Sequence, residues 1–197
     1  MTYLQKMSDD DLSSLLMENI QNKSTFNQLL FNGADINFKN ERGWNILFEL
    51  IVKNRSEEIL NFLRFGLDIN IRDNNGRNAL FWAIYHENVV AVKILLNQNI
   101  NLKIIEDENL WVMQYAVYKN NIEILSLLID SGLDINLKDN NNTTAIIYAI
   151  LYKRNKLINF LLINGASISH ADDFGNSALS LAQKFKIKRI TNLRNEG

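Results

Sequence analysis

The side chains that most often carry out chemistry in proteins are scarce in this sequence. It contains no cysteine and two histidines, His86 and His170. Without cysteine there is no disulfide, no thiolate nucleophile and no cysteine-ligated zinc. A zinc site needs three or four converging ligands, and the two histidines lie far apart along the chain. We therefore predict no catalytic residue, no cofactor and no metal site.

Two segments resemble ligand-binding sequences, and each has a simpler interpretation. The run Asp139-Asn140-Asn141-Asn142 is like the start of a calcium-binding loop. Ile150, however, stands where the closing glutamate of such a loop is required. The basic stretch 184–189 suggests nucleic acid, but cations are also favourable at the end of a final helix. Nucleophile-elbow, phosphate-loop and dinucleotide motifs are absent.

The composition is that of an ordinary folded, soluble chain, with 47% hydrophobic and 22% charged residues. A net charge of -1 gives no general attraction to nucleic acid or anionic lipid. The first residues lack the basic start and apolar run of a signal peptide. No stretch has the apolar length of a membrane span. We expect a cytoplasmic protein that binds neither nucleic acid nor membrane.

An internal sequence repeat predicts the secondary-structure elements and therefore the placement of the candidate side chains. Two series of glycine and asparagine recur at steps of 33 residues: Gly33, Gly66, Asn99, Gly132 and Gly165, and then Gly43, Gly76, Asn109, Asn142 and Gly175. Both residue types tolerate a left-handed backbone, so the first series predicts helix C-caps and the second predicts turns.

Each unit has the pattern of two short helices followed by an extended turn. Residues 78–84 open a helix with apolar residues at helical spacing, and a second apolar stripe runs from Val89 to Leu96. N-cap residues are expected at the start of the first helices, where their side chains accept from free backbone N–H groups: Asn45, Asn78, Thr144 and Ser177. Neither helix can bury its apolar stripe alone, so neighbouring units must stack.

With this period and the motifs Asp73-Asn74-Asn75-Gly76, Ala79-Leu80 and Gly165-Ala166, the sequence resembles the ankyrin repeat family. The resemblance implies an all-α solenoid of stacked helix-turn-helix units with short β-hairpin-like tips. The expected organisation is an N-terminal capping repeat (1–39), repeats at 40–72 and 73–105, a divergent repeat (106–138), a repeat at 139–171 and a C-terminal capping repeat (172–197).

The sequence departs from the family in one respect. None of the five units has the usual Thr-Pro-Leu-His start, whose histidine ties a unit together through bonds to the backbone. Apolar side chains such as Phe48, Phe81 and Ile147 are expected to substitute for it. The unit from Glu106 diverges most, and we expect the weakest stack or the most specialised surface there.

The resemblance also implies a binding surface, because hairpin tips and first helices line a concave face in ankyrin proteins. Ten positions match exposed places on that face: Trp44, Arg77, Trp82, Tyr85, His86, Leu110, Tyr115, Tyr118, Lys119 and Tyr152. Tyrosine and tryptophan are enriched among interface hot spots. Tyr85 and Tyr118, one period apart, would stack as a ladder. The alternative is that the column of Trp82, Tyr115 and Tyr148 belongs to the core.

The expected function is non-enzymatic binding of another protein through the concave face by a chain that is monomeric when free. Similar small ankyrin proteins act as inhibitors, immunity proteins or adaptors, and some bacterial ones act as secreted effectors. A structural or regulatory subunit of a larger assembly is the alternative. An enzyme would need a site that the sequence does not show.

Overall fold

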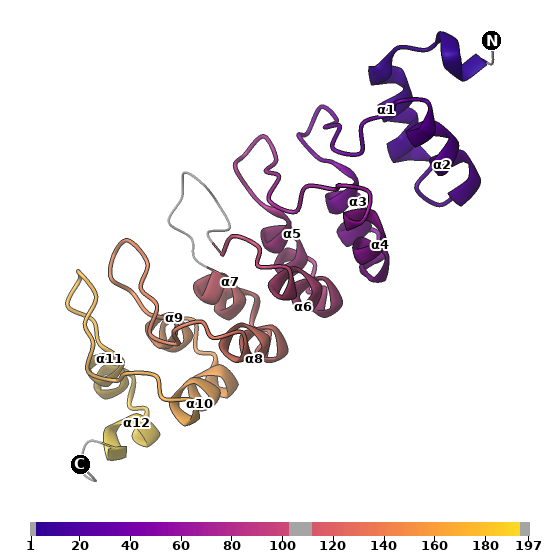
Figure 1. The fold of residues 1–197 in the computed structure, drawn as a ribbon. Coiled ribbons are helices and arrows are strands. Elements are labelled where there is room, and N and C mark those ends of the chain that lie inside the picture. The colour runs from indigo at the N-terminus through magenta and orange to yellow at the C-terminus, as the bar shows by residue number, and fades with distance from the viewer. Residues whose placement is uncertain (1–2, 103–111, 194–197) are drawn as a thin grey trace. The chain divides into compact units, whose positions relative to one another are not determined.

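The structure is a computed structural model, and it describes residues 3–102 and 112–193 (Figure 1). The chain forms two compact units, an N-terminal unit of residues 1–101 and a C-terminal unit of residues 102–197. Apart from the 3-10 turns η1 (Tyr3–Lys6) and η2 (Ser56–Glu58), the N-terminal unit contains α1 (Asp9–Glu18), α2 (Lys23–Phe31), α3 (Ile46–Val52), α4 (Ile59–Leu63), α5 (Ala79–Tyr85) and α6 (Val89–Asn97). The C-terminal unit contains α7 (Val112–Lys119), α8 (Ile122–Asp130), α9 (Ala145–Leu151), α10 (Asn155–Ile163), α11 (Ala178–Phe185) and α12 (Lys188–Leu193). The all-α prediction is confirmed.

The first helices α3, α5, α7, α9 and α11 begin at steps of 33 residues, and their N-caps explain why. Asn45 Oδ1 accepts from the backbone N–H of Leu47, Asn78 Oδ1 from Phe81 and Ser177 Oγ from Ser180. Such caps satisfy backbone donors that a helix start leaves free. Thr144 also occupies an N-cap, as predicted, but its buried hydroxyl makes no hydrogen bond within the described residues.

The two glycine and asparagine series adopt the left-handed backbone that the sequence predicts. The φ angle ranges from 55° at Asn99 to 100° at Gly33 in the first series. In the second series it is positive at Gly43, Gly76, Asn142 and Gly175, while Asn109 lies outside the described residues. These conformations end the second helices and shape the hairpin tips.

A third left-handed series, which we did not predict, lies in the turn between the two helices of each unit. It recurs at the same step of 33 residues, with φ between 53° and 59°, at Asn54, Glu87, Asn120, Lys153 and Lys186. Glutamate and lysine rarely adopt this conformation, because their Cβ atoms approach the following carbonyl oxygen. The series was missed because glutamate and lysine give no turn signal, so Asn54 and Asn120 alone did not form a recognisable repeat.

The hairpin tips are held by the side chain that begins each one. The backbone N–H of Asp73 donates to the carbonyl of Arg77 (2.9 Å), and Asp73 Oδ1 accepts from the N–H groups of Asn75 and Arg77. Asp139 and Asp172 repeat this arrangement. The run 139–142 is therefore a hairpin tip, whose leading carboxylate is already committed to its own turn.

Asparagines join successive hairpins within each unit of the molecule. Asn37 Oδ1 accepts from the N–H of Asp68 (2.7 Å), and its amide donates to the carbonyl of Gly66 (2.9 Å). In the C-terminal unit, Asn136 Oδ1 accepts from the N–H of Ser167 (2.7 Å). The recurring Asp-Ile-Asn phrase thus specifies hydrogen bonds between repeats. In Figure 1, the hairpins before α3 and α5 project to the same side of the N-terminal unit.

The apolar core follows the predicted columns. Leu47, Leu80, Met113 and Ile146 are buried, as are Phe48, Phe81 and Ile147 at the position of the family's histidine. Gln114 occupies that position in the repeat of α7, and its Nε2 donates to the carbonyls of Leu137 (3.0 Å) and Thr143 (3.2 Å). Gln114 therefore makes the backbone bonds expected of the absent histidine. No helix of the described ranges is both long and apolar enough to span a membrane.

Candidate aromatic binding surfaces

Each unit carries a cluster of aromatic side chains on its first helices, beside its hairpins. The Trp cluster of the N-terminal unit consists of Trp44, Arg77, Trp82, Tyr85 and His86. The Tyr cluster of the C-terminal unit consists of Tyr115, Tyr118, Tyr148 and Tyr152. Together the two clusters contain most of the residues predicted to bind a partner.

A buried carboxylate supports the Trp cluster from the hairpin tip. Asp73, whose side chain is fully buried, accepts hydrogen bonds from Trp82 Nε1 (3.0 Å) and Arg77 Nε (2.9 Å). The Arg77 guanidinium also lies 4.6 Å from the centre of the Trp82 ring, within the range of a cation–π contact. Trp82, which is half-buried, is thereby fixed in position, with its indole N–H already satisfied.

Trp44 packs edge-on against Trp82, with ring centroids 4.8 Å apart. It is only 8% exposed, so the prediction that it stands open on the binding face is wrong. The burial arises because Trp44 lies at the base of its hairpin, between Trp82 and Phe48. The rim of Trp44 still lines a recess of about 410 Å³, together with Arg42, Asn74, Asn75, Arg77 and Trp82.

The exposed end of the Trp cluster lies at the C-terminus of α5. Tyr85 is 48% exposed and its ring centroid lies 5.1 Å from that of His86, which is also exposed. The His86 ring stacks against Trp82 at 6.1 Å. Trp82 therefore serves as the base on which Tyr85 and His86 are presented to solvent.

The Tyr cluster repeats this arrangement with phenol rings. The Tyr148 hydroxyl donates to Asp139 Oδ2 at 2.6 Å, so the hairpin carboxylate again holds a first-helix aromatic ring. Burial, and then the hydrogen bond and negative charge of Asp139, raise the pKa of Tyr148 well above its ordinary value. Tyr148 is therefore a neutral hydrogen-bond donor at physiological pH.

The other three tyrosine rings continue from Tyr148 as a row of successive ring contacts. Ring centroids are 5.8 Å apart for Tyr148 and Tyr152, 6.0 Å for Tyr152 and Tyr118, and 5.9 Å for Tyr118 and Tyr115. The four rings and Gln114 line a recess of about 270 Å³. Tyr118 and Tyr152 are 55% and 42% exposed, whereas Tyr115 is 7% exposed. Of the two alternatives for Tyr115, the structure agrees with the core position and not with the exposed one, because its ring packs beneath the cluster.

The other predicted positions are distributed as follows. Lys119 ends α7 and is half-buried, while Leu110 and the acidic residues 106–108 lie outside the described residues. Tyr85 and Tyr118 belong to different units, so their stacking as a ladder stays a prediction. His170 bonds the carbonyl of Asn142 (2.9 Å) and lies in the other unit from His86. The described residues contain no group of three His, Asp or Glu suited to a metal ion.

The link between hairpin aspartate and aromatic ring was missed by sequence reasoning, although a signal exists. Trp82 follows Asp73 by nine residues, and Tyr148 follows Asp139 by the same interval. Both aromatic side chains carry a hydrogen-bond donor that can reach the carboxylate. In the unit of Asp172 the equivalent residue is Leu181, which has no donor and is buried.

Comparison with known proteins agrees with this geometry. The family model described as ankyrin repeats (3 copies) matches residues 15–106 and 105–172. A search of curated protein sequences found no significant match. Ankyrin repeats generally mediate protein–protein interaction, and the family is typically non-enzymatic. With its helix pairs, its hairpin tips and this match over most of its length, the chain belongs to the ankyrin repeat family.

Proposed function

We propose that this chain is a non-enzymatic module that binds one partner protein in the cytoplasm, as an inhibitor, immunity protein or adaptor does. The contact residues are the exposed aromatics of the first helices, Tyr85 and His86 in the N-terminal unit and Tyr118 and Tyr152 in the C-terminal unit. Trp82 and Tyr148 act as supports beneath them.

The observation that carries this proposal is the difference between supporting and exposed rings. Trp82 and Tyr148 have their polar atoms bonded to aspartates, whereas Tyr85, Tyr118 and Tyr152 remain 42% to 55% exposed. Large aromatic rings on rigid helices lose little conformational entropy on binding and contribute much contact area. Rings held in this way fit an interface better than they fit a core.

Affinity capture from the native lysate tests the proposal. The immobilised chain is compared with the double variant Tyr85→Ala/Tyr118→Ala, and retained proteins are identified by mass spectrometry. We expect a stoichiometric protein to be retained by the wild type and lost with the variant. The matched control is Phe31→Ala/Ile163→Ala, which removes two exposed apolar side chains (91% and 75% exposed) at the ends of second helices.

Circular dichroism of each variant shows whether the fold is preserved. Retention of the same protein by wild type and double variant would contradict the assignment of the first-helix aromatics. Retention of a large complex, with no single stoichiometric protein, would favour a structural or regulatory subunit instead.

A further inference from the structure

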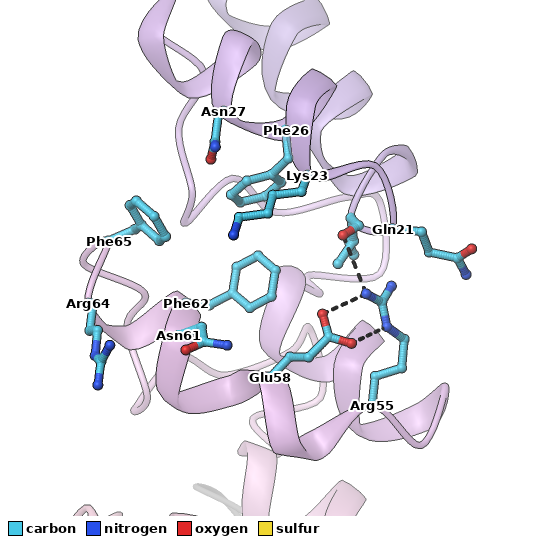
Figure 2. A pocket seen from close by; sticks show the side chains of 11 residues that line it. Gln21, Lys23, Phe26, Asn27, Arg55, Glu58, Asn61, Phe62, Arg64 and Phe65 are labelled. Carbon is cyan, nitrogen blue, oxygen red and sulfur yellow. Dashed lines mark hydrogen bonds and ion pairs between the residues drawn. The ribbon is translucent and has the colours of Figure 1, made fainter.

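A groove on the second helices of the N-terminal unit has chemistry that the aromatic clusters do not use. It lies between α2 and the η2–α4 segment and has a volume of about 370 Å³, within the range of ligand pockets (Figure 2). The helix on one side of it, α4, spans five residues, whereas α6, α8 and α10 span nine each. The 3-10 turn η2 directly precedes α4, in the place of a first helical turn.

The floor of the groove is aromatic. Phe26 from α2 and Phe62 from α4 meet edge-to-face with ring centroids 4.9 Å apart, and both are buried. Phe65, just after α4, contacts Phe26 at 6.3 Å and is 54% exposed (Figure 2). A side chain entering the groove would therefore meet one exposed ring at the edge and two buried rings at the base.

The charges around the groove have an excess of one sign. Three cations, Lys23, Arg55 and Arg64, line it together with the single carboxylate of Glu58. Arg55 and Glu58 neutralise each other, because Nε and Nη2 of the guanidinium each donate to a carboxylate oxygen at 2.6 Å. Lys23 and Arg64 are exposed and form no ion pair within the described residues. The available charge is thus positive on a chain whose net charge is -1.

Exposed amides complete the groove, among them Asn27 from α2 and Asn61 from α4. An amide side chain offers both a donor and an acceptor, which is what the backbone of an extended peptide requires. Rim charges select a partner of opposite sign and accelerate its association.

We propose that this groove is a second docking site, which takes a short segment of a partner protein with one aromatic side chain between acidic residues. The aromatic ring lies on Phe26, Phe62 and Phe65, and the flanking carboxylates lie against Lys23 and Arg64. This site is independent of the proposed function of the first-helix aromatics, because none of their residues lines it.

The test is an NMR titration of the full-length 15N-labelled chain with the peptide acetyl-Glu-Asp-Phe-Asp-Glu-amide. We expect saturable shifts of the amides in residues 20–27 and 55–65. The same peptide with alanine in place of phenylalanine should bind at least fivefold more weakly, and so should a peptide with lysine in place of all four acids. Affinity for the acidic peptide should fall with added salt.

Variants localise the effect. Phe65→Ala and Lys23→Gln/Arg64→Gln should each weaken binding of the acidic peptide at least fivefold. The controls Phe31→Ala, which removes an exposed ring outside the groove, and Lys93→Gln/Lys156→Gln, which removes two exposed second-helix cations, should change affinity less than twofold. All of these positions are exposed, so folding is retained and the amide spectrum verifies it.

Several results would overturn the proposal. They are the absence of saturable shifts in these two segments, equal binding of acidic and basic peptides, or equal loss in groove and control variants. Shifts of the same amides with protein concentration alone would show that a second copy of the chain occupies the groove. None of these outcomes bears on the first-helix aromatics, so the two proposals fail separately.

Discussion

The Trp cluster and the Tyr cluster both fix an aromatic ring of a first helix in place, but with different hydrogen-bonding groups. In both, an aspartate at a hairpin tip holds an aromatic ring that lies nine residues further along the chain. Asp73 is fully buried and also bonds a cation, Arg77, whereas Asp139 is half-buried and bonds only neutral donors among the contacts described here. From this comparison we infer that the hairpin aspartate holds the ring in place, and that a more deeply buried carboxylate contributes more to stability.

The largest expected effect comes from removing the two carboxylates. Asp73→Ala leaves Trp82 Nε1, the Arg77 guanidinium and two turn N–H groups without their acceptor, and we expect a loss of about 3 kcal/mol in the free energy of unfolding. Asp139→Ala should cost about half as much, because water reaches its site. Urea denaturation followed by circular dichroism measures both. Equal losses would show that carboxylate depth does not matter.

A smaller effect is expected where the clusters differ at the position of the family's histidine. Phe81 fills it with an apolar ring, whereas Gln114 donates to the carbonyl of Leu137 in its own repeat and to that of Thr143 in the next. Gln114→Leu keeps the size of the side chain but leaves the carbonyls of Leu137 and Thr143 without this donor, which should cost about 1–2 kcal/mol. The urea midpoint is the readout. An unchanged midpoint would mean that apolar packing alone holds this repeat to its neighbour.

The pH dependence of stability should distinguish the two clusters. Because the pKa of Tyr148 is raised by folding, the folded state keeps this proton when the unfolded chain releases it near pH 10. The resulting contribution to stability is fully present below pH 10 and is lost as the pH rises above it. Between pH 8 and 10.5 the wild type should therefore lose more unfolding free energy than Tyr148→Phe. Parallel decline of both proteins would contradict the assignment.

The smallest expected effect concerns the left-handed turn between helices. Lys153 has a φ of 57° in the C-terminal unit, and glycine removes the steric cost of that conformation. Lys153→Gly should raise the free energy of unfolding by about 0.5 kcal/mol. Lys156→Gly, three residues later within α10, should lower it by about 1 kcal/mol. The same sign for both changes would show that backbone strain is unimportant at Lys153.

Much of this architecture could be predicted from the sequence, because residues that favour helix ends and helix starts recur at a fixed step. Gly33, Gly66 and Asn99 marked the helix ends, and Asn45 and Asn78 marked the helix starts. The family model and the helix order confirm the fold inferred from them.

The exposure of the candidate binding residues was predicted less well, since exposure depends on neighbours that a repeat alignment does not show. Trp44 was placed on the open face, and Tyr115 either there or in the core. Trp82 packs against Trp44 and Tyr118 packs against Tyr115, and both Trp44 and Tyr115 are buried. The groove beside α4 was missed for a related reason. It lies beside a helix shortened by a 3-10 turn, and residues 56–63 contain no glycine or proline that would signal a break.

Hydroxyl-radical footprinting of the free chain and of its complex with the captured partner tests the central claim most directly. The method reports the exposure of each aromatic and aliphatic side chain in one experiment. We predict that Tyr85, Tyr118 and Tyr152 lose reactivity in the complex, while Phe31 and Ile163 react equally in both states. Protection of Phe31 or Ile163 with the three tyrosines unchanged would contradict the claim that the partner binds the first-helix aromatics.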